Sequence, residues 1–188
     1  MKFVKILILT FCYSFFFLYS IAMSYEETNY KIVKKEKSFE IRKYSDRLAV
    51  ETNESGSDSN FRKLFNYISG KNENNEKIKM TTPVTQVKKN GITSMQFYLP
   101  SKYNLKNVPN PARKDVHIII IEGGYYAVLR YSGRASDKNF TNHKSILQNV
   151  LHKNNILTIG LPIRATYDSP FTLPKNRRNE VMIKINYK

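Results

Sequence analysis

Histidines are the first residues to inspect for acid–base or metal chemistry, and this chain has three. His143 and His152 fall nine positions apart in one helical pattern, so they lie on different faces and cannot share a metal ion. His117 stands at the head of a run of isoleucines. The pattern fits surface or helix-end histidines, with His143 and His117 the better candidates for ligating a metal singly.

Carboxylates that could act as bases are scarce, at 15 Asp and Glu in total. Glu40, Glu51 and Glu180 lie in strand-like stretches, and a hydrolase would need Glu51 or Glu180 to face a cleft. The alternative, which we favour, is that each of these glutamates pairs with a nearby arginine, such as Arg42, Arg177 or Arg178. Nucleophile-elbow, zinc-protease and nucleotide-binding motifs are absent. We therefore predict a protein that is not an enzyme.

The N-terminal segment has the order of a secretory signal. Lys2 and Lys5 precede an apolar stretch over residues 6–23, and Ala22 offers a small residue for cleavage. We predict a signal peptide over residues 1–22 and an exported protein, periplasmic or secreted. A retained membrane anchor is the alternative. Cys12 is the only cysteine, so the mature chain can form no disulfide and no cysteine-based zinc site.

A net charge of +16 attracts anions such as nucleic acid, acidic lipid headgroups or carboxylate ligands, but a solvated basic surface explains it as well and is the interpretation we favour. The lysines are dispersed and accompany no nucleic-acid-binding motif, so we do not expect nucleic acid as a partner. We expect a monomer, with membrane association only through an uncleaved N-terminal segment.

Two parts of the chain resemble each other, which indicates how the domain is built. Residues 57–61 (SDSNF) match residues 136–140 (SDKNF), an offset of 79 positions. The same offset carries Pro83 to Pro162. We predict a duplicated unit whose two halves span about residues 30–100 and 114–187, with a ligand cleft where they meet.

Each half is expected to contain one helix among several strands. Apolar residues recur at helical spacing over residues 61–68 and 140–151, and Gly70 suits the first helix end. Alternating or continuous apolar residues predict the strands, at residues 39–44, 48–52, 78–80, 95–99, 116–121, 125–131, 161–167 and 181–187. The fold class is α+β, a twisted antiparallel sheet or distorted open β-barrel with two main helices.

Several motifs together resemble the SOUL family of haem-binding proteins. They are KIKMTTPV at residues 77–84, YDSPF at 167–171 and RRNEV at 177–181, with weaker blocks EIRKY at 40–44, FRKL at 61–64, FYLPSKY at 97–103 and YSG at 131–133. The resemblance covers residues 27–187, predicted as one domain. It implies a barrel made from a duplicated βαββ-type unit, in agreement with the internal repeat.

The resemblance also implies non-covalent binding of haem or a related tetrapyrrole against an apolar face beside the first helix, with basic side chains near the propionates. The residues implicated are Phe61, Arg62, Lys63, Leu64, Phe65, Met80, Phe171, Lys175, Arg177 and Arg178. His143 and His117 are the candidate axial ligands. The helical stripe over residues 61–68 fits plain core packing as well, and that is the interpretation we favour.

These features give one leading function and two alternatives. The leading one is haem buffering, capture or delivery outside the cytoplasm. The first alternative is a carrier or sensor of another amphipathic anionic small molecule, which the basic charge suggests. The second is a small-molecule hydrolase.

Overall fold

The computed structural model of the chain describes residues 25–54 and 57–187. The predicted signal peptide, or anchor, over residues 1–22 lies outside the described residues. Within the described part, no helix has the length and apolar character needed to cross a bilayer.

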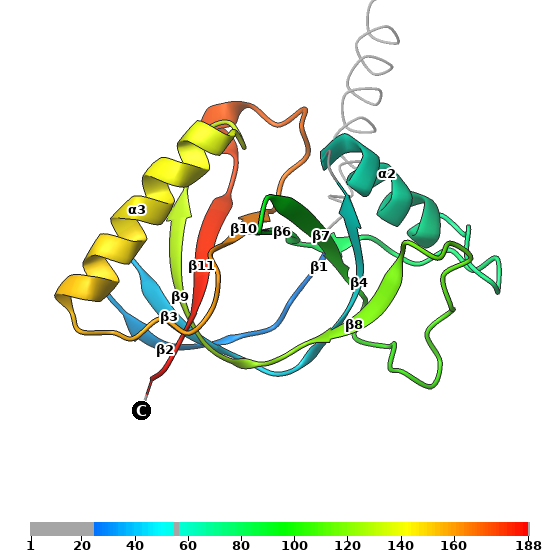
Figure 1. The fold of residues 1–188 in the computed structure, drawn as a ribbon, viewed down its shortest axis with the longest axis horizontal. Helices are drawn as coiled ribbons and strands as arrows, with labels where there is room; N and C mark the ends of the chain where they lie inside the picture. Colours follow the sequence, from blue (N-terminus) through cyan, green and yellow to red (C-terminus); the bar gives the residue numbers. More distant parts are fainter. Residues whose placement is uncertain (1–24, 55–56, 188) are drawn as a thin grey trace, which may run out of the picture.

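One antiparallel sheet of nine strands dominates the described residues, in the order β2-β3-β9-β11-β10-β6-β7-β4-β8. In chain order the strands are β2 (Lys31–Lys35), β3 (Glu40–Tyr44), β4 (Arg47–Glu54), β6 (Val84–Lys89), β7 (Ile92–Tyr98), β8 (His117–Ile121), β9 (Gly124–Tyr131), β10 (Ile163–Thr166) and β11 (Asn179–Ile185). The short strands β1 (Glu26–Glu27) and β5 (Thr81–Thr82) pair in parallel beside it. The sheet curls into a half-barrel (Figure 1). This confirms the predicted α+β class.

Two helices cover the outer face of the half-barrel, one on each side (Figure 1). Helix α2 (Ser57–Ile68) lies against β4 and β7, and helix α3 (Asp137–Lys153) lies against β9 and β11. Ser136 caps α3 by accepting a hydrogen bond from the Asn139 N–H, which satisfies one of the free donors of the first turn.

Each helix packs over its own core cluster. Leu147 and Leu151 of α3 are buried with Val181 and Ile183 of β11. Under α2 the corresponding cluster contains Leu64, Tyr67, Ile68, Val50 and Phe97. Both helices therefore owe their position to apolar burial, at about 25 cal/mol per Å² of apolar surface removed from water.

The two halves of the chain meet through β6 and β10, which are neighbouring strands. Outward from this pair the order is β7, β4 and β8 on one side and β11, β9 and β3 on the other. The order does not by itself show a duplication, which stays a prediction. Because the halves join by backbone pairing, the sheet is continuous where we predicted a cleft.

The strand predictions were correct for most of the sheet and wrong in three places. Strand β2 was not expected, because three of the five residues in its sequence KIVKK are lysines. Strand β6 was not expected, because its sequence VTQVKK has few apolar residues. Residues 78–80 were expected to form a strand and lie in a connection, although Ile78 is buried beneath α2. At residues 78–80 the apolar side chains therefore mark buried positions and do not indicate a strand.

The face of the sheet opposite the helices is polar and aromatic. Glu180 is fully buried there and accepts hydrogen bonds from Arg42, Arg178 and the Tyr167 hydroxyl. The Arg42 guanidinium also lies over the Tyr30 ring, 4.2 Å from its centroid. This buried network, centred on Glu180, fills the interior of the half-barrel between β3, β10 and β11.

Candidate functional surface beside helix α2

Helix α2 presents two aromatic rings to solvent. Phe61 and Phe65 are 42% and 49% exposed, and their rings stack with centroids 6.0 Å apart. By contrast, Leu64 and Ile68 on the same helix are buried. The favoured interpretation of this stripe as core is therefore correct for Leu64 and Ile68 and wrong for the two phenylalanines. We call Phe61 and Phe65 the aromatic pair.

The two basic residues of α2 differ in exposure and in pairing. Arg62 is exposed and makes no ion pair or hydrogen bond with any described residue. Lys63 forms an ion pair with Asp115 at 2.8 Å. Met80, expected near the ligand, packs against the core cluster beneath α2. Of these three, Arg62 remains accessible to a ligand.

Sheet register links the aromatic pair to the loop between β10 and β11. The Phe61 ring contacts Phe97 of β7 in an edge-to-face arrangement at 5.2 Å. Phe97 pairs with Val84 of β6, and Val84 pairs with Thr166 of β10. Strands lie about 4.8 Å apart, so Thr166 lies roughly 10 Å from Phe97. The loop over residues 167–178 starts at Thr166, and it rises between the two helices in Figure 1.

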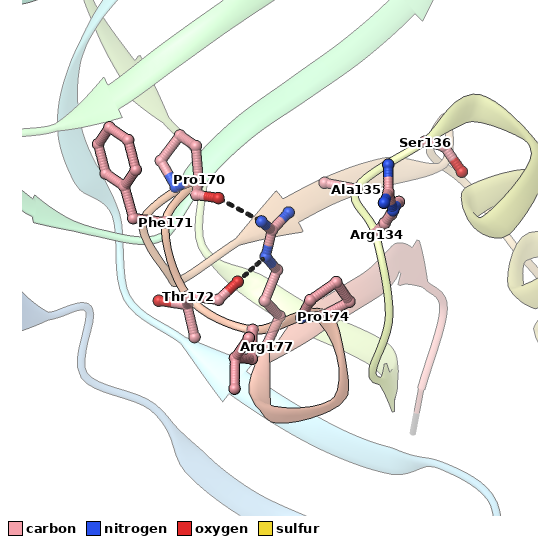
Figure 2. A pocket seen from close by; sticks show the side chains of 9 residues that line it. Arg134, Ala135, Ser136, Pro170, Phe171, Thr172, Pro174 and Arg177 are labelled. Carbon is pink, nitrogen blue, oxygen red and sulfur yellow. Dashed lines mark hydrogen bonds between the residues drawn. The ribbon is translucent and has the colours of Figure 1, made fainter.

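That loop forms one side of a pocket of about 460 Å³. The other side comes from the turn before α3, at residues 134–136 (Figure 2). Phe171 stands at the rim and is 95% exposed, with its ring pointing away from Arg177. The lining combines two guanidinium groups with Pro170, Leu173 and other apolar side chains. Such a mixture suits a ligand that is apolar with an anionic end.

The two arginines of the pocket have different roles. Arg177 donates hydrogen bonds to the carbonyl oxygens of Thr172 and Pro170, and so holds the loop in its curve (Figure 2). Arg134 is exposed and makes no side-chain bond with any described residue. The left-handed conformation of Gly133, at φ 101°, sets the turn that presents Arg134. Lys175 is also exposed and unpaired among the described residues.

Arg178, which the family resemblance placed beside the ligand, lies instead in the interior network and pairs with Glu180, as the favoured interpretation of the strand glutamates predicted. Its guanidinium donates to both carboxylate oxygens of Glu27, at 2.9 and 2.8 Å, and to Glu180. Burial alone raises the pKa of Glu180, but the hydrogen bonds and charges of Arg42 and Arg178 outweigh it, so that pKa lies below its ordinary value. Glu180 is buried, its oxygens accept hydrogen bonds from Arg42, Arg178 and Tyr167, and its lowered pKa makes it a weak proton acceptor, so it does not fit the base that a hydrolase would need.

The pairing of the other two glutamates was predicted with mixed success. Glu40 forms an ion pair with Arg42, as expected. Glu51 pairs with no arginine of the described residues and accepts a hydrogen bond from the Gln96 amide at 2.7 Å.

Neither candidate histidine joins the aromatic pair or the pocket. The His143 ring stacks on Tyr131 at 4.1 Å, and its Nδ1 lies 2.8 Å from the Asn139 carbonyl oxygen. His117 is exposed on β8 and lies opposite Glu51 of β4. The next residue of β4, Val50, points into the core beneath α2, so Glu51 and His117 point to the other face of the sheet, away from α2. The described residues contain no cluster of three His, Cys, Asp or Glu suited to hold a metal.

The accessible groups fit a flat, apolar molecule with carboxylates. The aromatic pair and Phe171 offer ring surface, and Arg62, Arg134 and Lys175 offer unpaired cations. A porphyrin has this combination, since its macrocycle is apolar and its propionates are anionic. Among the described residues the fit is by packing and charge, without a histidine poised to ligate iron.

Sequence comparison then places the protein. Residues 25–184 match the model of the family described as SOUL heme-binding protein. The chain belongs to this family. It is also 31% identical over 160 residues to Heme-binding protein 2 of mouse and of human, which covers 78% of this chain and 77% of each relative. SOUL proteins are binding proteins, and the resemblance seen in the motifs is confirmed.

Solved structures share the fold of this SOUL protein at much lower identity. The C-terminal domain of EcmrR matches 85% of this chain and 99% of its own length, with a TM-score of 0.60 and 10% identity. A protein from Listeria innocua whose structure is named a hydrolase matches 82% and 94%, with a TM-score of 0.58 and 7% identity. These likenesses show the architecture alone.

Sequence reasoning missed Arg134 as a site residue. Arg134 lies two residues before the helix cap Ser136, and in the folded chain it lines the same pocket as Phe171. No local pattern brings residue 134 to residue 171; the antiparallel pairing of β9 with β11 does.

Proposed function

We propose that this SOUL protein binds haem or a related tetrapyrrole non-covalently on the surface formed by the aromatic pair and the loop over residues 167–178. The observation that carries the proposal is the aromatic pair itself. Two stacked, half-exposed phenylalanines in a basic member of this family expose apolar area that water disfavours and that a macrocycle would cover.

In this arrangement the rings and the cations act separately. The macrocycle lies against Phe61 and Phe65, and Phe171 covers a further part of it. Propionates pair with Arg62 or with Arg134 and Lys175 at the loop. Bound haem would supply the iron, whose ligand is not among the residues of this surface. We propose capture, buffering or delivery of the ligand outside the cytoplasm as the role.

A haem titration tests the proposal. The wild-type protein should give a saturable change in the Soret band at micromolar concentration. Metal-free protoporphyrin should bind with similar affinity, because the contacts come from the macrocycle and its propionates. A Leu105→Ser variant, altered at a 63% exposed residue that does not line the pocket, is the control and should bind as wild type. The absence of a saturable Soret change would refute the proposal.

Another amphipathic anion is the second candidate for the same surface. The pocket favours it, because Arg134 and the apolar loop residues could hold a carboxylate with an apolar body smaller than a porphyrin. Native mass spectrometry of protein purified from its own host would identify the bound molecule. A non-tetrapyrrole ligand released from wild type and lost from Arg134→Gln would favour this candidate.

A further inference from the structure

A second apolar surface lies away from the aromatic pair, in the connection between α3 and β10. Leu157, Ile159 and Leu161 are 62%, 57% and 45% exposed. The connection is held in an extended form, because the Ile159 N–H donates to the Lys184 carbonyl and the Asn186 N–H donates to the Leu157 carbonyl. These three side chains are therefore displayed from a fixed backbone along the end of β11.

Sheet geometry extends this surface to the hairpin between β6 and β7. Leu161 lies two positions before Ile163, which packs in the cluster on the sheet face opposite the helices. Ile163 pairs with Val87 of β6, and two residues further along β6 Lys89 pairs with Ile92, which is 54% exposed. Side chains two apart along a strand share a face. We call the set Leu157, Ile159, Leu161 and Ile92 the aliphatic face.

The charge around the aliphatic face is mainly positive. Residues 77–114 and 138–167, which contain this face, include no aspartate or glutamate. Exposed Lys88 and Lys89 flank it at the hairpin, and exposed Lys153 flanks it at the end of α3. Two acids lie near its border, and each is paired with a cation: Glu122 with Lys184 at 3.0 Å, and Asp137, which also interacts electrostatically with Lys88, with Arg164 at 2.6 Å. The border therefore keeps a net positive charge.

We propose that the aliphatic face docks the protein on an anionic lipid bilayer. Exposed aliphatic side chains ringed by lysines match the two layers of such a surface, with apolar groups entering the acyl boundary and ammonium groups meeting the anionic headgroups. A second copy of this chain fits less well, because it would bring Lys88, Lys89 and Lys153 against their own counterparts without acids to pair them.

Docking in this way leaves the ligand surface open. The aromatic pair lies on the helix-covered face of the sheet, where Phe61 packs on Phe97, whereas the aliphatic face continues from Ile163 on the other. Lipid binding and tetrapyrrole binding are therefore separate properties, and each can be measured without the other.

Vesicle sedimentation tests the docking with ligand-free protein. The form used is the chain from Met23 onward, which contains every helix and strand described above. It should sediment with phosphatidylcholine vesicles containing about 30% phosphatidylglycerol and much less with phosphatidylcholine alone. The triple variant L157S/I159S/L161S should bind at least about tenfold more weakly, since three apolar anchors are lost. K88E/K89E should also weaken binding about tenfold and reduce its salt sensitivity.

The matched control is Leu105→Ser. Leu105 is 63% exposed, as Leu157 is 62%, but it follows the end of β7 opposite to Ile92. It should bind vesicles as wild type does. Circular dichroism should show all variants folded, because the changed side chains are at the surface. Equal sedimentation of the triple variant and wild type would overturn the proposal, as would a wild-type dimer in ultracentrifugation that the triple variant abolishes.

Discussion

Basic side chains on the two faces of the sheet have opposite fates. On the inner face, Arg42 and Arg178 are locked, since both bind Glu180 and Arg178 also binds Glu27 through two hydrogen bonds. On the outer surface, Arg62 and Arg134 bind no described side chain. An arginine therefore stabilises the fold where a carboxylate lies beside it, and it is free to bind a ligand where none does.

Aromatic side chains repeat the contrast. Inner-face rings are used by the protein's own cations, as where the Arg47 guanidinium lies 4.2 Å from the Tyr44 ring centroid and 4.9 Å from that of Tyr98. Phe61 and Phe65 on α2 have no such cover. The rings of the inner face are thus covered by the protein's own guanidinium groups, whereas those of the outer surface are available to a ligand.

The sharpest test of the buried network centred on Glu180 is the substitution Glu180→Ala. Removing the carboxylate leaves Arg42 and Arg178 buried without their common partner, and breaking a buried pair in this way costs about 3–5 kcal/mol. The free energy of unfolding in urea should fall by that amount. Glu122→Gln, at an exposed ion pair, is the control and should change it by less than about 1 kcal/mol. Similar small losses for both variants would show that the inner network does not stabilise the fold.

The acid limb of stability should depend on the same carboxylate. The pKa of Glu180 lies below its ordinary value of 4.5 in the folded protein, so folding favours the ionised form. Its contribution is therefore fully present above pH 4.5 and is lost as the pH falls through the lower, folded-state pKa. Urea unfolding between pH 6 and pH 3 should show a decline that is clearly shallower in Glu180→Gln. Identical declines would mean that other carboxylates govern the acid limb.

For the open surface, the matching test is the double variant F61S/F65S. Removing two half-exposed rings should weaken haem binding roughly 30-fold, at about 1 kcal/mol for each ring. The loss of stability should be smaller than for a core residue, because both rings are only about half buried. Leu64→Ala, one residue away and fully buried, should do the reverse, with a loss of about 2–5 kcal/mol in stability. If F61S/F65S binds haem normally, the aromatic pair is not the ligand surface.

The smallest expected effect concerns the free cations. Arg134→Gln should weaken haem binding about threefold at low salt, as expected for an exposed ion pair. The difference from wild type should shrink as ionic strength rises, because salt screens exposed charges. Arg178→Gln should instead lower the unfolding free energy, since its guanidinium serves Glu27 and Glu180. An Arg178 variant with reduced haem affinity and unchanged stability would show that Arg178 binds the ligand and does not hold the fold together.

Elements with strong local patterns were predictable from the sequence. The stripe from Phe61 to Ile68 predicts α2, and the alternation in residues 181–187 predicts β11. The direction that each side chain takes was less predictable. A helical stripe defines one face, but the sheet covers only Leu64 and Ile68 completely and leaves Phe61 and Phe65, at the edge of that contact, about half exposed. Helical spacing alone does not show where that edge lies.

Residue roles that depend on distant partners were predicted only in part: the pairing of Glu180 with Arg42 was expected, and the separate roles of Arg177 and Arg178 were not. The neighbours Arg177 and Arg178 belong to one motif, and both were expected at the ligand. Their fates separate because Glu27, far away in the sequence, reaches Arg178 across the half-barrel while Arg177 binds loop carbonyls. Only the folded chain brings those groups together.

The measurement that most directly tests the central claim is an amide NMR spectrum recorded with and without ferric haem, whose paramagnetic iron broadens nearby signals. Broadening should centre on α2 around residues 61–66 and on the loop over residues 167–178. Metal-free protoporphyrin should shift the same amides without broadening them, and amides of residues 157–161 should be unaffected by either. Broadening centred on β2 and β3, or around His117, would place the ligand elsewhere and contradict the account.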